Sequence, residues 1–398
     1  MEISQETLAF INTHRYEDVR ELALRATKFP GVDMSTAITQ IAGRQIATLK
    51  IPSWSKVQEL RYPNHLPLEQ CSSEATARYK ASLVEGKSLV DLTGGFGIDC
   101  AFLSSRFEKI IYVEQQESLC KLAIYNYHLL HLDHIQVKHA DAISFLEEME
   151  AVDCIFIDPA RRNEHGGKTI AIEDCTPDVS ELQYLLLNKA RRILIKLSPM
   201  LDITKVMHAM PHTSEIHIVS VNNECKELLL LVGKELIKDP LIQCVNLQNE
   251  NKQIFSFKHS QEQESNCVYE EDLGEYLYEP NASIMKAGAF KYLASVYKVN
   301  KLHPNSHLYT SNILVRDFPG RVFRVADLCS FNKKEFRKRF TEIKKANISV
   351  RNFPASVAEI RKRLNLLDGG ETYFFATTLN SGKKVLINCT KCDLETEM

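Results

Sequence analysis

The sequence predicts an α/β fold in which a mostly parallel sheet carries helices on both faces and ends in an antiparallel hairpin. Two observations predict it. Between residues 88 and 197, five short apolar, β-branched runs alternate with amphipathic segments that suit helices. This alternation is typical of a parallel sheet. Beyond the fifth run, apolar stretches at 215–221 and 227–232 flank the turn-prone residues 222–224. A hairpin there would close one edge of the sheet.

The segments around this sheet divide the chain into four expected parts. Residues 1–70 carry apolar residues at helical spacing and predict a helical region. Residues 71–235 hold the sheet, and the hydrophilic, acidic stretch that opens 236–318 predicts a linker before a small mixed segment. Residues 319–393 combine basic helices with two short strands. The strands expected in the sheet are Ser88–Leu92, Ile110–Glu114, Ile135–Ala140, Cys154–Ile157 and Ile193–Leu197.

Composition narrows the class of protein. The 398 residues are 44 % hydrophobic and 25 % charged, close to the average of soluble globular proteins. No apolar run reaches the length that spans a bilayer, and the first residues lack the pattern of a secretory signal. Eleven cysteines are too few for a disulfide scaffold, so we expect a cytoplasmic protein. The net charge of -2 provides no global attraction for nucleic acid.

A glycine loop follows the first expected strand. The strand ends at Asp91, and the loop of residues 92–97 leads into a helix near Ile98. A dinucleotide-binding loop needs a third glycine, but Cys100 stands there, and Asp91 would repel a pyrophosphate. An NAD-dependent oxidoreductase is therefore the least favoured interpretation. The same acid would attract a cationic amino acid, which points to the ammonium and sulfonium of S-adenosylmethionine.

Three further acids follow successive strands. Glu114, Asp141 and Asp158 end the second, third and fourth expected strands, and the carboxyl ends of parallel strands meet where ligands bind. The spacing acid-x-x-x-Gly-x-Gly resembles motif I of the class I S-adenosylmethionine-dependent methyltransferases, whose sheet is Rossmann-like. The resemblance implies that Glu114 accepts the ribose hydroxyls and Asp141 reads the adenine amino group. We expect the cofactor to be held by Asp91, Thr93, Gly95, Gly97, Glu114 and Asp141.

The end of the fourth strand bears on the reaction. Methyltransferases that act on exocyclic amines have Asp/Asn-Pro-Pro-aromatic there, whereas this chain reads Asp-Pro-Ala-Arg-Arg over 158–162. We predict Asp158, Pro159 and Arg161 as catalytic residues, with Asp158 orienting the nucleophile and taking its proton. An arginine can stack on a base or clamp a phosphate, although a surface ion pair would also explain it. The residues expected to contact the substrate are Arg162, Lys196 and Asn222.

The C-terminal third is locally basic. Residues 319–365 contain thirteen lysines and arginines and four acids, an excess typical of phosphate-binding surfaces. A solvated helix face is the alternative interpretation. Four phenylalanines interleave with the bases, and their spacing suits a small core as well as stacking platforms for bases. They are Phe331, Phe336, Phe340 and Phe353.

The same region resembles a known family. The stretches 351–354, 364–370 and 373–379, together with 158–162, look like bacterial methyltransferases that carry a C-terminal THUMP-like domain. The resemblance implies a small ferredoxin-like segment within 236–318, a THUMP-like domain at 319–393 and an RNA substrate, either tRNA or rRNA. Two alternatives remain: a methyltransferase acting on a protein or small molecule, and a non-catalytic RNA-binding protein that retains the scaffold.

Two weaker patterns concern metals. His128, His131 and His134 recur every third residue, but a metal site also needs carboxylate or thiolate ligands and a closed geometry, so we interpret them as helix-surface and loop histidines. Cys389 and Cys392 form a C-x-x-C with no second pair at zinc spacing. We therefore expect no metal site.

Overall fold

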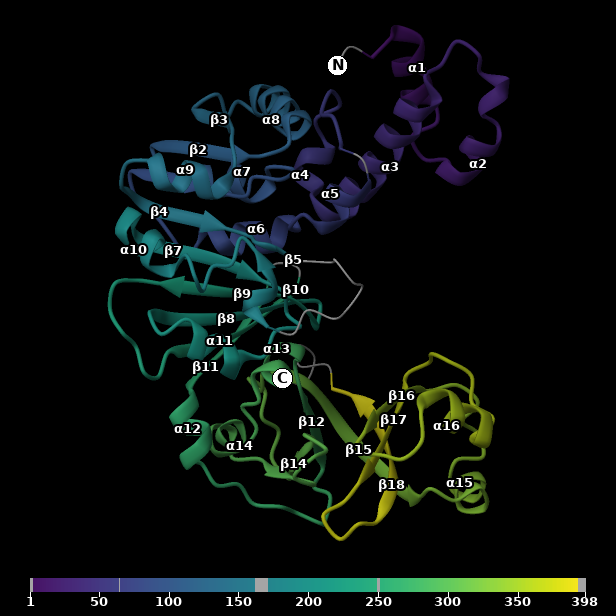
Figure 1. The fold of residues 1–398 in the computed structure, drawn as a ribbon. Coiled ribbons are helices and arrows are strands. Elements are labelled where there is room, and N and C mark those ends of the chain that lie inside the picture. The colour runs from purple at the N-terminus through teal and green to yellow at the C-terminus, as the bar shows by residue number, and fades with distance from the viewer. Residues whose placement is uncertain (1–2, 64, 162–170, 249–250, 393–398) are drawn as a thin grey trace. The chain divides into compact units, whose positions relative to one another are not determined.

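A computed structural model describes residues 3–63, 65–161, 171–248 and 251–392 (Figure 1). The chain forms two compact units. The first unit comprises residues 1–216 and 227–238, and the second comprises residues 217–226 and 239–398. In the part of the chain that is described, no helix is both long enough and apolar enough to cross a bilayer.

The first unit contains the predicted parallel sheet. Its strands follow the order β9-β7-β4-β1-β2-β3, in which only β9 runs antiparallel to its neighbour β7. Because β4 and β2 flank β1, the strand order reverses beside β1, where open α/β sheets bind their ligands. The strands are β1 (Ser88–Asp91), β2 (Lys109–Glu114), β3 (Ile135–His139), β4 (Val152–Ile157), β7 (Ala190–Leu197) and β9 (Glu224–Val232).

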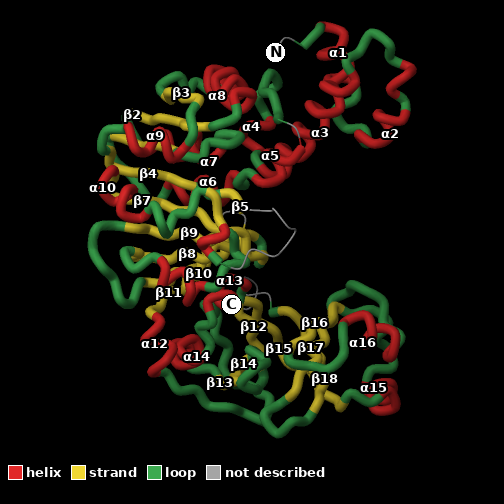
Figure 2. The backbone as a smooth tube through the Cα atoms, viewed as in Figure 1, coloured by secondary structure: helices red, strands yellow, loops and turns green. Residues whose placement is uncertain are grey.

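Helices alternate with these strands, as Figure 2 shows, and the N-terminal segment is helical as predicted. Several helices begin at side-chain caps that the sequence displays, such as Ser4, Asp33 and Asp202. The helices are α1 (Gln5–Thr13), α2 (Val19–Leu24), α3 (Met34–Lys50), α4 (Pro52–Ser55), α5 (His65–Gln70), α6 (Glu74–Ala81), α7 (Ile98–Leu103), α8 (Glu117–Leu129), α9 (Ala142–Glu148), α10 (Gln183–Lys189) and α11 (Ile203–Ala209). A two-stranded ribbon pairs β5 (Ala160–Arg161) with β6 (Cys175–Thr176).

The predicted terminal hairpin is present. Strand β8 (Thr213–Val221) turns into β9 through Asn222 and Asn223, whose φ angles are 50° and 64°. Two consecutive residues at positive φ are typical of the tight turns that match strand twist. The turn residues belong to the second unit, where the amide of Asn222 donates to the carbonyl of Leu247 at 2.9 Å.

The second unit begins where the sequence analysis expected a linker. Residues 241–264 form an antiparallel hairpin and a helix instead, namely β10 (Leu241–Gln248), β11 (Asn251–Lys258) and α12 (His259–Glu264). The physical reason is an alternation hidden within a hydrophilic stretch: Ile242 and Cys244 on β10 and Phe255 and Phe257 on β11 are buried.

A seven-stranded sheet forms the rest of the second unit, in the order β13-β14-β12-β15-β18-β17-β16. All its pairs are antiparallel except β16 with β17. The strands are β12 (Tyr276–Pro280), β13 (Asn300–Lys301), β14 (Tyr309–Ser311), β15 (Gly320–Ser330), β16 (Asn347–Arg351), β17 (Thr372–Thr378) and β18 (Lys384–Lys391). The helices are α13 (Ala282–Ala287), α14 (Lys291–Tyr297), α15 (Lys333–Arg339) and α16 (Val357–Leu364).

Helices α15 and α16 cover a small core of their own. Phe336 and Phe340 are buried there with Phe374, Ile360 and Leu364. The helical spacing of these phenylalanines therefore reflects a core, and the alternative of exposed stacking platforms is excluded for these two residues.

Candidate active site

Acidic residues converge at the carboxyl edge of the first unit's sheet. Asp91 ends β1, Glu114 ends β2 and Asp158 follows β4 directly. Lys196 lies near the end of β7, the neighbour of β4. Since these four strands are adjacent and parallel, their ends form one local site at the point where the strand order reverses.

The loop after β1 depends on glycine. Gly95 and Gly97 have φ angles of 56° and 85°, which favour residues without a Cβ. A Cβ on Gly97 would also collide with the hydroxyl of Tyr127. Two buried tyrosines fix the loop, because Tyr112 Oη donates to the Gly95 carbonyl at 2.6 Å and Tyr127 Oη donates to the Gly97 carbonyl at 3.0 Å. The loop therefore presents its backbone to the site in one defined conformation.

Glu114 is held by backbone amides. Its Oε2 accepts from the amide of Gly95 at 2.9 Å, and its Oε1 accepts from the amide of Gln116 at 2.8 Å. Each carboxylate oxygen has a further lone pair, so the group can still accept hydroxyl donors from a ligand. The bond to Gly95 also couples this acid to the glycine loop.

Asp91 is buried and incompletely paired. It is 1 % exposed, and its Oδ1 accepts from the amide of Thr93 at 3.0 Å. Its Oδ2 is buried and has no hydrogen-bond partner among the described residues. Burial raises the pKa of Asp91 well above its usual range, and the nearby Asp99, Asp158 and Glu114 carboxylates raise it further. A cationic donor from a ligand would supply the missing partner.

Thr93 connects the glycine loop to the residue expected to be catalytic. Its Oγ1 accepts from the backbone amide of Asp158 at 2.6 Å, and the neighbouring Leu92 amide donates to the Phe156 carbonyl at 3.0 Å. The hydroxyl thereby fixes where the chain leaves β4. The sequence pattern carried no signal for this contact.

Asp158 contacts a lysine backed by further charges. The ammonium of Lys196 pairs with Asp158 Oδ2 and lies 3.9 Å from Asp99 Oδ2. Asp99 Oδ1 lies 3.2 Å from Nζ of the fully buried Lys80, which also donates to both oxygens of Glu227 at 2.8 Å. These alternating charges form a continuous chain, which we call the ion chain: Asp158, Lys196, Asp99, Lys80 and Glu227.

Charges within the ion chain shift the pKa values of two of its members, Lys196 and Asp99. Burial opposes the charge of Lys196, but the Asp158 and Asp99 carboxylates outweigh it and hold the pKa of Lys196 above its usual value. Burial likewise disfavours the Asp99 carboxylate, yet Lys80 and Lys196 hold its pKa below the usual value. The sequence carries no signal for the pairing of Asp99, Lys80 and Glu227, since no local pattern joins residues so far apart in the chain.

The other predicted residues are placed differently. Asp141 caps α9, because its Oδ1 accepts from the amides of Ser144 at 3.0 Å and Ile143 at 3.1 Å, and the Ser144 amide lowers the pKa of Asp141. Asn222 lies in the hairpin turn of the second unit. The roles predicted for both in ligand binding stay predictions.

The residues after Asp158 are only partly described. Pro159 is buried, and the backbone of Arg161 pairs with Cys175 in the β5–β6 ribbon. The Arg161 side chain and all of Arg162 lie outside the described residues. Among the described residues, no group of three His, Cys, Asp or Glu side chains has the arrangement of a metal site.

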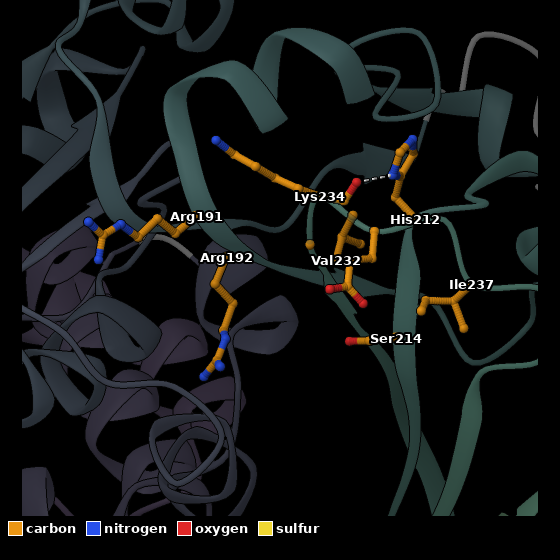
Figure 3. Close-up of a pocket in the computed structure, with 9 residues that line it drawn as sticks. Arg191, Arg192, His212, Ser214, Val232, Lys234 and Ile237 are labelled. Atoms are coloured by element: carbon orange, nitrogen blue, oxygen red, sulfur yellow. Dashed lines mark hydrogen bonds between the residues drawn. The ribbon is translucent and has the colours of Figure 1, made fainter.

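A separate pocket lies at the opposite edge of the sheet, where β7 begins (Figure 3). Arg191 and Arg192 come from that strand, and His212 Nδ1 lies 3.1 Å from the neighbouring Lys234 carbonyl among the lining residues. None of the convergent acids lines it. The acids on which the predicted cofactor and acceptor contacts depend therefore gather at the carboxyl edge and not in this pocket.

Comparison with known proteins adds family relationships. Residues 276–319 match a family described as a ferredoxin-like domain, and residues 320–391 match one described as THUMP domain-like. A crystal structure from Porphyromonas gingivalis W83, described as a "putative methyltransferase", is 33 % identical in sequence. The match covers 99 % of this chain and 100 % of that chain, with a TM-score of 0.87. No curated protein matches.

Two further solved structures are similar at lower scores. An rRNA methylase from Streptococcus thermophilus is 14 % identical over 40 % of this chain and 96 % of its own, with a TM-score of 0.30. An O-methyltransferase from Bacillus cereus in complex with S-adenosylhomocysteine is 13 % identical over 49 % of this chain and 98 % of its own, with a TM-score of 0.36.

Proposed function

This chain belongs to the family of the Porphyromonas gingivalis protein that is described as a "putative methyltransferase", and from that membership we propose that it transfers a methyl group from S-adenosylmethionine to a base in tRNA or rRNA. The family and the methyltransferase fold are the premise. The cofactor, the acceptor and the residues that carry the reaction are the proposal.

The residues at the carboxyl edge fit the cofactor. The observation that carries the proposal is the buried, unpartnered Oδ2 of Asp91, which suits an ammonium donor. Glu114 would accept the ribose hydroxyls, and the backbone of Gly95 and Gly97 would approach the ligand without a Cβ in the way. Asp141 would read the adenine amino group. When bound, the cofactor supplies an electrophilic methyl group on a positively charged sulfur.

Asp158 is the residue we assign to the acceptor. Lys196 occupies its Oδ2, and no described residue pairs with its Oδ1, which is therefore available to accept a hydrogen bond from the attacking nitrogen. Methyl transfer is a displacement that depends mainly on positioning, so an oriented acceptor oxygen is a sufficient contribution. Pro159 restricts the backbone beside it. Arg161 and Arg162 would contact the acceptor's base or phosphate.

The second unit supports RNA as the acceptor. Residues 320–391 match the THUMP domain-like family, and the local excess of basic residues lies in the same segment. We further propose that the catalytic domain spans 71–235, between a helical region at 1–70 and the C-terminal domains at 236–318 and 319–393. All eleven cysteines are free thiols, which is compatible with the cytoplasm.

One labelling experiment tests the proposal. The purified protein is incubated with methyl-labelled S-adenosylmethionine and total RNA from cells lacking its gene, beside the isosteric variant Asp158→Asn. We expect label in one RNA size fraction with the unaltered protein and at least a tenfold loss with the variant. Label in protein or small molecules would replace RNA as the acceptor. An absence of S-adenosylhomocysteine binding by calorimetry would support the non-catalytic scaffold instead.

A further inference from the structure

The outer surface of α15 and the segments beside it carries unpaired positive charge. Helix α15 packs against α16, and the loop after α15 lies beside the loop after α16, where the Leu367 amide donates to the Lys344 carbonyl at 2.9 Å. We call the following exposed residues the basic face, and none of them forms an ion pair with a described residue: Lys334, Arg337, Lys338, Lys344, Lys345 and Lys362.

Other cations of the same segment are already neutralised. Arg339 Nη1 lies 2.9 Å from Asp327 Oδ1, and Arg361 contacts the Asp368 carboxylate. Arg321 and Arg351 both contact the buried Glu279. The segment therefore contains two classes of basic side chain: those paired with a carboxylate and those of the basic face, which are not. Only the charge of the basic face is available to a polyanion.

Helical spacing orients the basic face away from the core. Lys334 and Lys338 are four residues apart and lie on the side of α15 opposite Phe336, which is 2 % exposed. Their ammonium groups therefore project into solvent next to one another. This arrangement suits the regularly spaced phosphates of a nucleic-acid backbone.

Among the described residues 320–392, no aromatic ring is exposed on this surface. Each of the eight aromatic rings in the described residues 320–392 packs against another ring. Phe331 is partly buried: its ring centroid lies 5.0 Å from that of Phe353, and the Arg363 guanidinium lies 4.3 Å from the Phe331 centroid. None of these eight rings is exposed: five are buried, and Phe331, Phe353 and Tyr373 are partly buried against other rings.

From these two observations we infer that the basic face binds the phosphate backbone of a double-stranded RNA segment, which deepens the RNA acceptor proposed above and rests on it. Proteins that hold single strands combine positive charge with aromatic platforms on which bases stack. Duplex RNA hides its bases and is recognised through phosphates and 2′-hydroxyls. A surface with exposed cations and no exposed ring fits the duplex.

The test compares two RNAs on the full chain. One is a fully paired hairpin and the other is oligo(U) of equal length, both labelled for fluorescence anisotropy at several KCl concentrations. We expect at least tenfold tighter binding of the hairpin. The triple variant Lys334→Gln/Arg337→Gln/Lys338→Gln should lower that affinity at least tenfold and reduce the slope of log Kd against log [KCl] by about two to three.

A matched variant controls for charge loss. Arg339→Gln removes a cation from the same helix that Asp327 already neutralises, so hairpin binding should change less than twofold. The melting temperatures of both variants verify folding. Equal binding of the two RNAs, or a preference for oligo(U), overturns the inference of duplex binding. The proposal that the methyl acceptor is RNA is unaffected by that result. If neither RNA binds at low salt, both this inference and the RNA acceptor are wrong.

Discussion

The ammonium of Lys196 pairs with the carboxylate of Asp158 where two adjacent parallel strands end. The register pairs Ile157 with Ile195, which places the next residue of each strand side by side. Behind this pair, the ion chain continues through Asp99 and Lys80 to Glu227. Asp158 is therefore the partly exposed end of a buried charge arrangement and not an isolated surface acid.

Removing Lys196 should affect both stability and catalysis. Lys196→Met leaves the buried Asp99 and the adjoining Asp158 without this cation, and we expect a loss of roughly 3 kcal/mol in the free energy of unfolding. Lys196→Arg should restore most of that loss. In the same proteins, methyl transfer should fall at least tenfold with Lys196→Met while the Kd for S-adenosylhomocysteine changes less than threefold.

Urea unfolding and calorimetry measure these quantities, and Lys121→Met is the control because its exposed pair with Glu117 contributes little. A large loss of S-adenosylhomocysteine binding with Lys196→Met would show that Lys196 belongs to the cofactor site instead.

The variant Asp91→Asn should change protein stability and cofactor binding in opposite directions. The raised pKa means that the folded, cofactor-free protein holds the Asp91 proton more tightly than the unfolded chain. This contribution to stability is present at low pH and is lost as pH rises from about 3.9, the unfolded value, through the folded pKa. The neutral variant should therefore have a higher melting temperature than the parent at alkaline pH.

The same variant should lose cofactor binding. Saturating S-adenosylhomocysteine should raise the melting temperature of the parent by mass action and leave that of Asp91→Asn unchanged. Melting curves from pH 5 to pH 9, with and without ligand, measure both effects. An equal ligand-induced shift in the two proteins would contradict the assignment of Asp91 to the ammonium.

Gly97→Ala should damage the glycine loop. Alanine at position 97 would have to adopt the left-handed backbone conformation that the loop imposes, which costs about 1 kcal/mol, and its Cβ would collide with the Tyr127 hydroxyl. We expect at least a tenfold weaker affinity for S-adenosylhomocysteine by calorimetry. Gly369→Ala is matched in backbone, with a φ of 91° and no atom within 4 Å of its Cβ, and should leave that affinity unchanged. Partial rescue of Gly97→Ala by Tyr127→Phe would identify the collision as the cause.

The single tryptophan should report binding. Trp54 is 4 % exposed, and its ring centroid lies 5.5 Å from that of Phe96, which stands between Gly95 and Gly97. Ligand contact with the loop should change Trp54 emission in a saturable titration, with a midpoint equal to the calorimetric Kd. The variant Trp54→Phe, titrated in the same way, measures the emission change that does not come from Trp54. A constant emission despite calorimetric binding would show that the loop and Trp54 are not coupled.

Local patterns in the sequence determined the sheet and the ends of its strands. Buried parallel strands need continuous apolar runs, and a loop at positive φ needs glycine, so both features are visible without the rest of the chain. For this reason the five parallel strands, the terminal hairpin and the position of Asp91 and Glu114 could be predicted. The hydrophilic stretch 241–258 could not, because its few buried residues are separated by polar ones and leave the stretch hydrophilic on average.

Only the tertiary structure decided how charged and aromatic side chains are paired. Lys80, Asp99 and Glu227 come from α6, α7 and β9, and their contacts arise because folding buries them together and a buried charge requires a partner. The same holds for Phe336 and Phe340, whose spacing allowed either a core or a stacking surface until α15 packed onto the sheet. A strand pattern is set by neighbours in sequence, whereas the partner of a buried charge is set by neighbours in space.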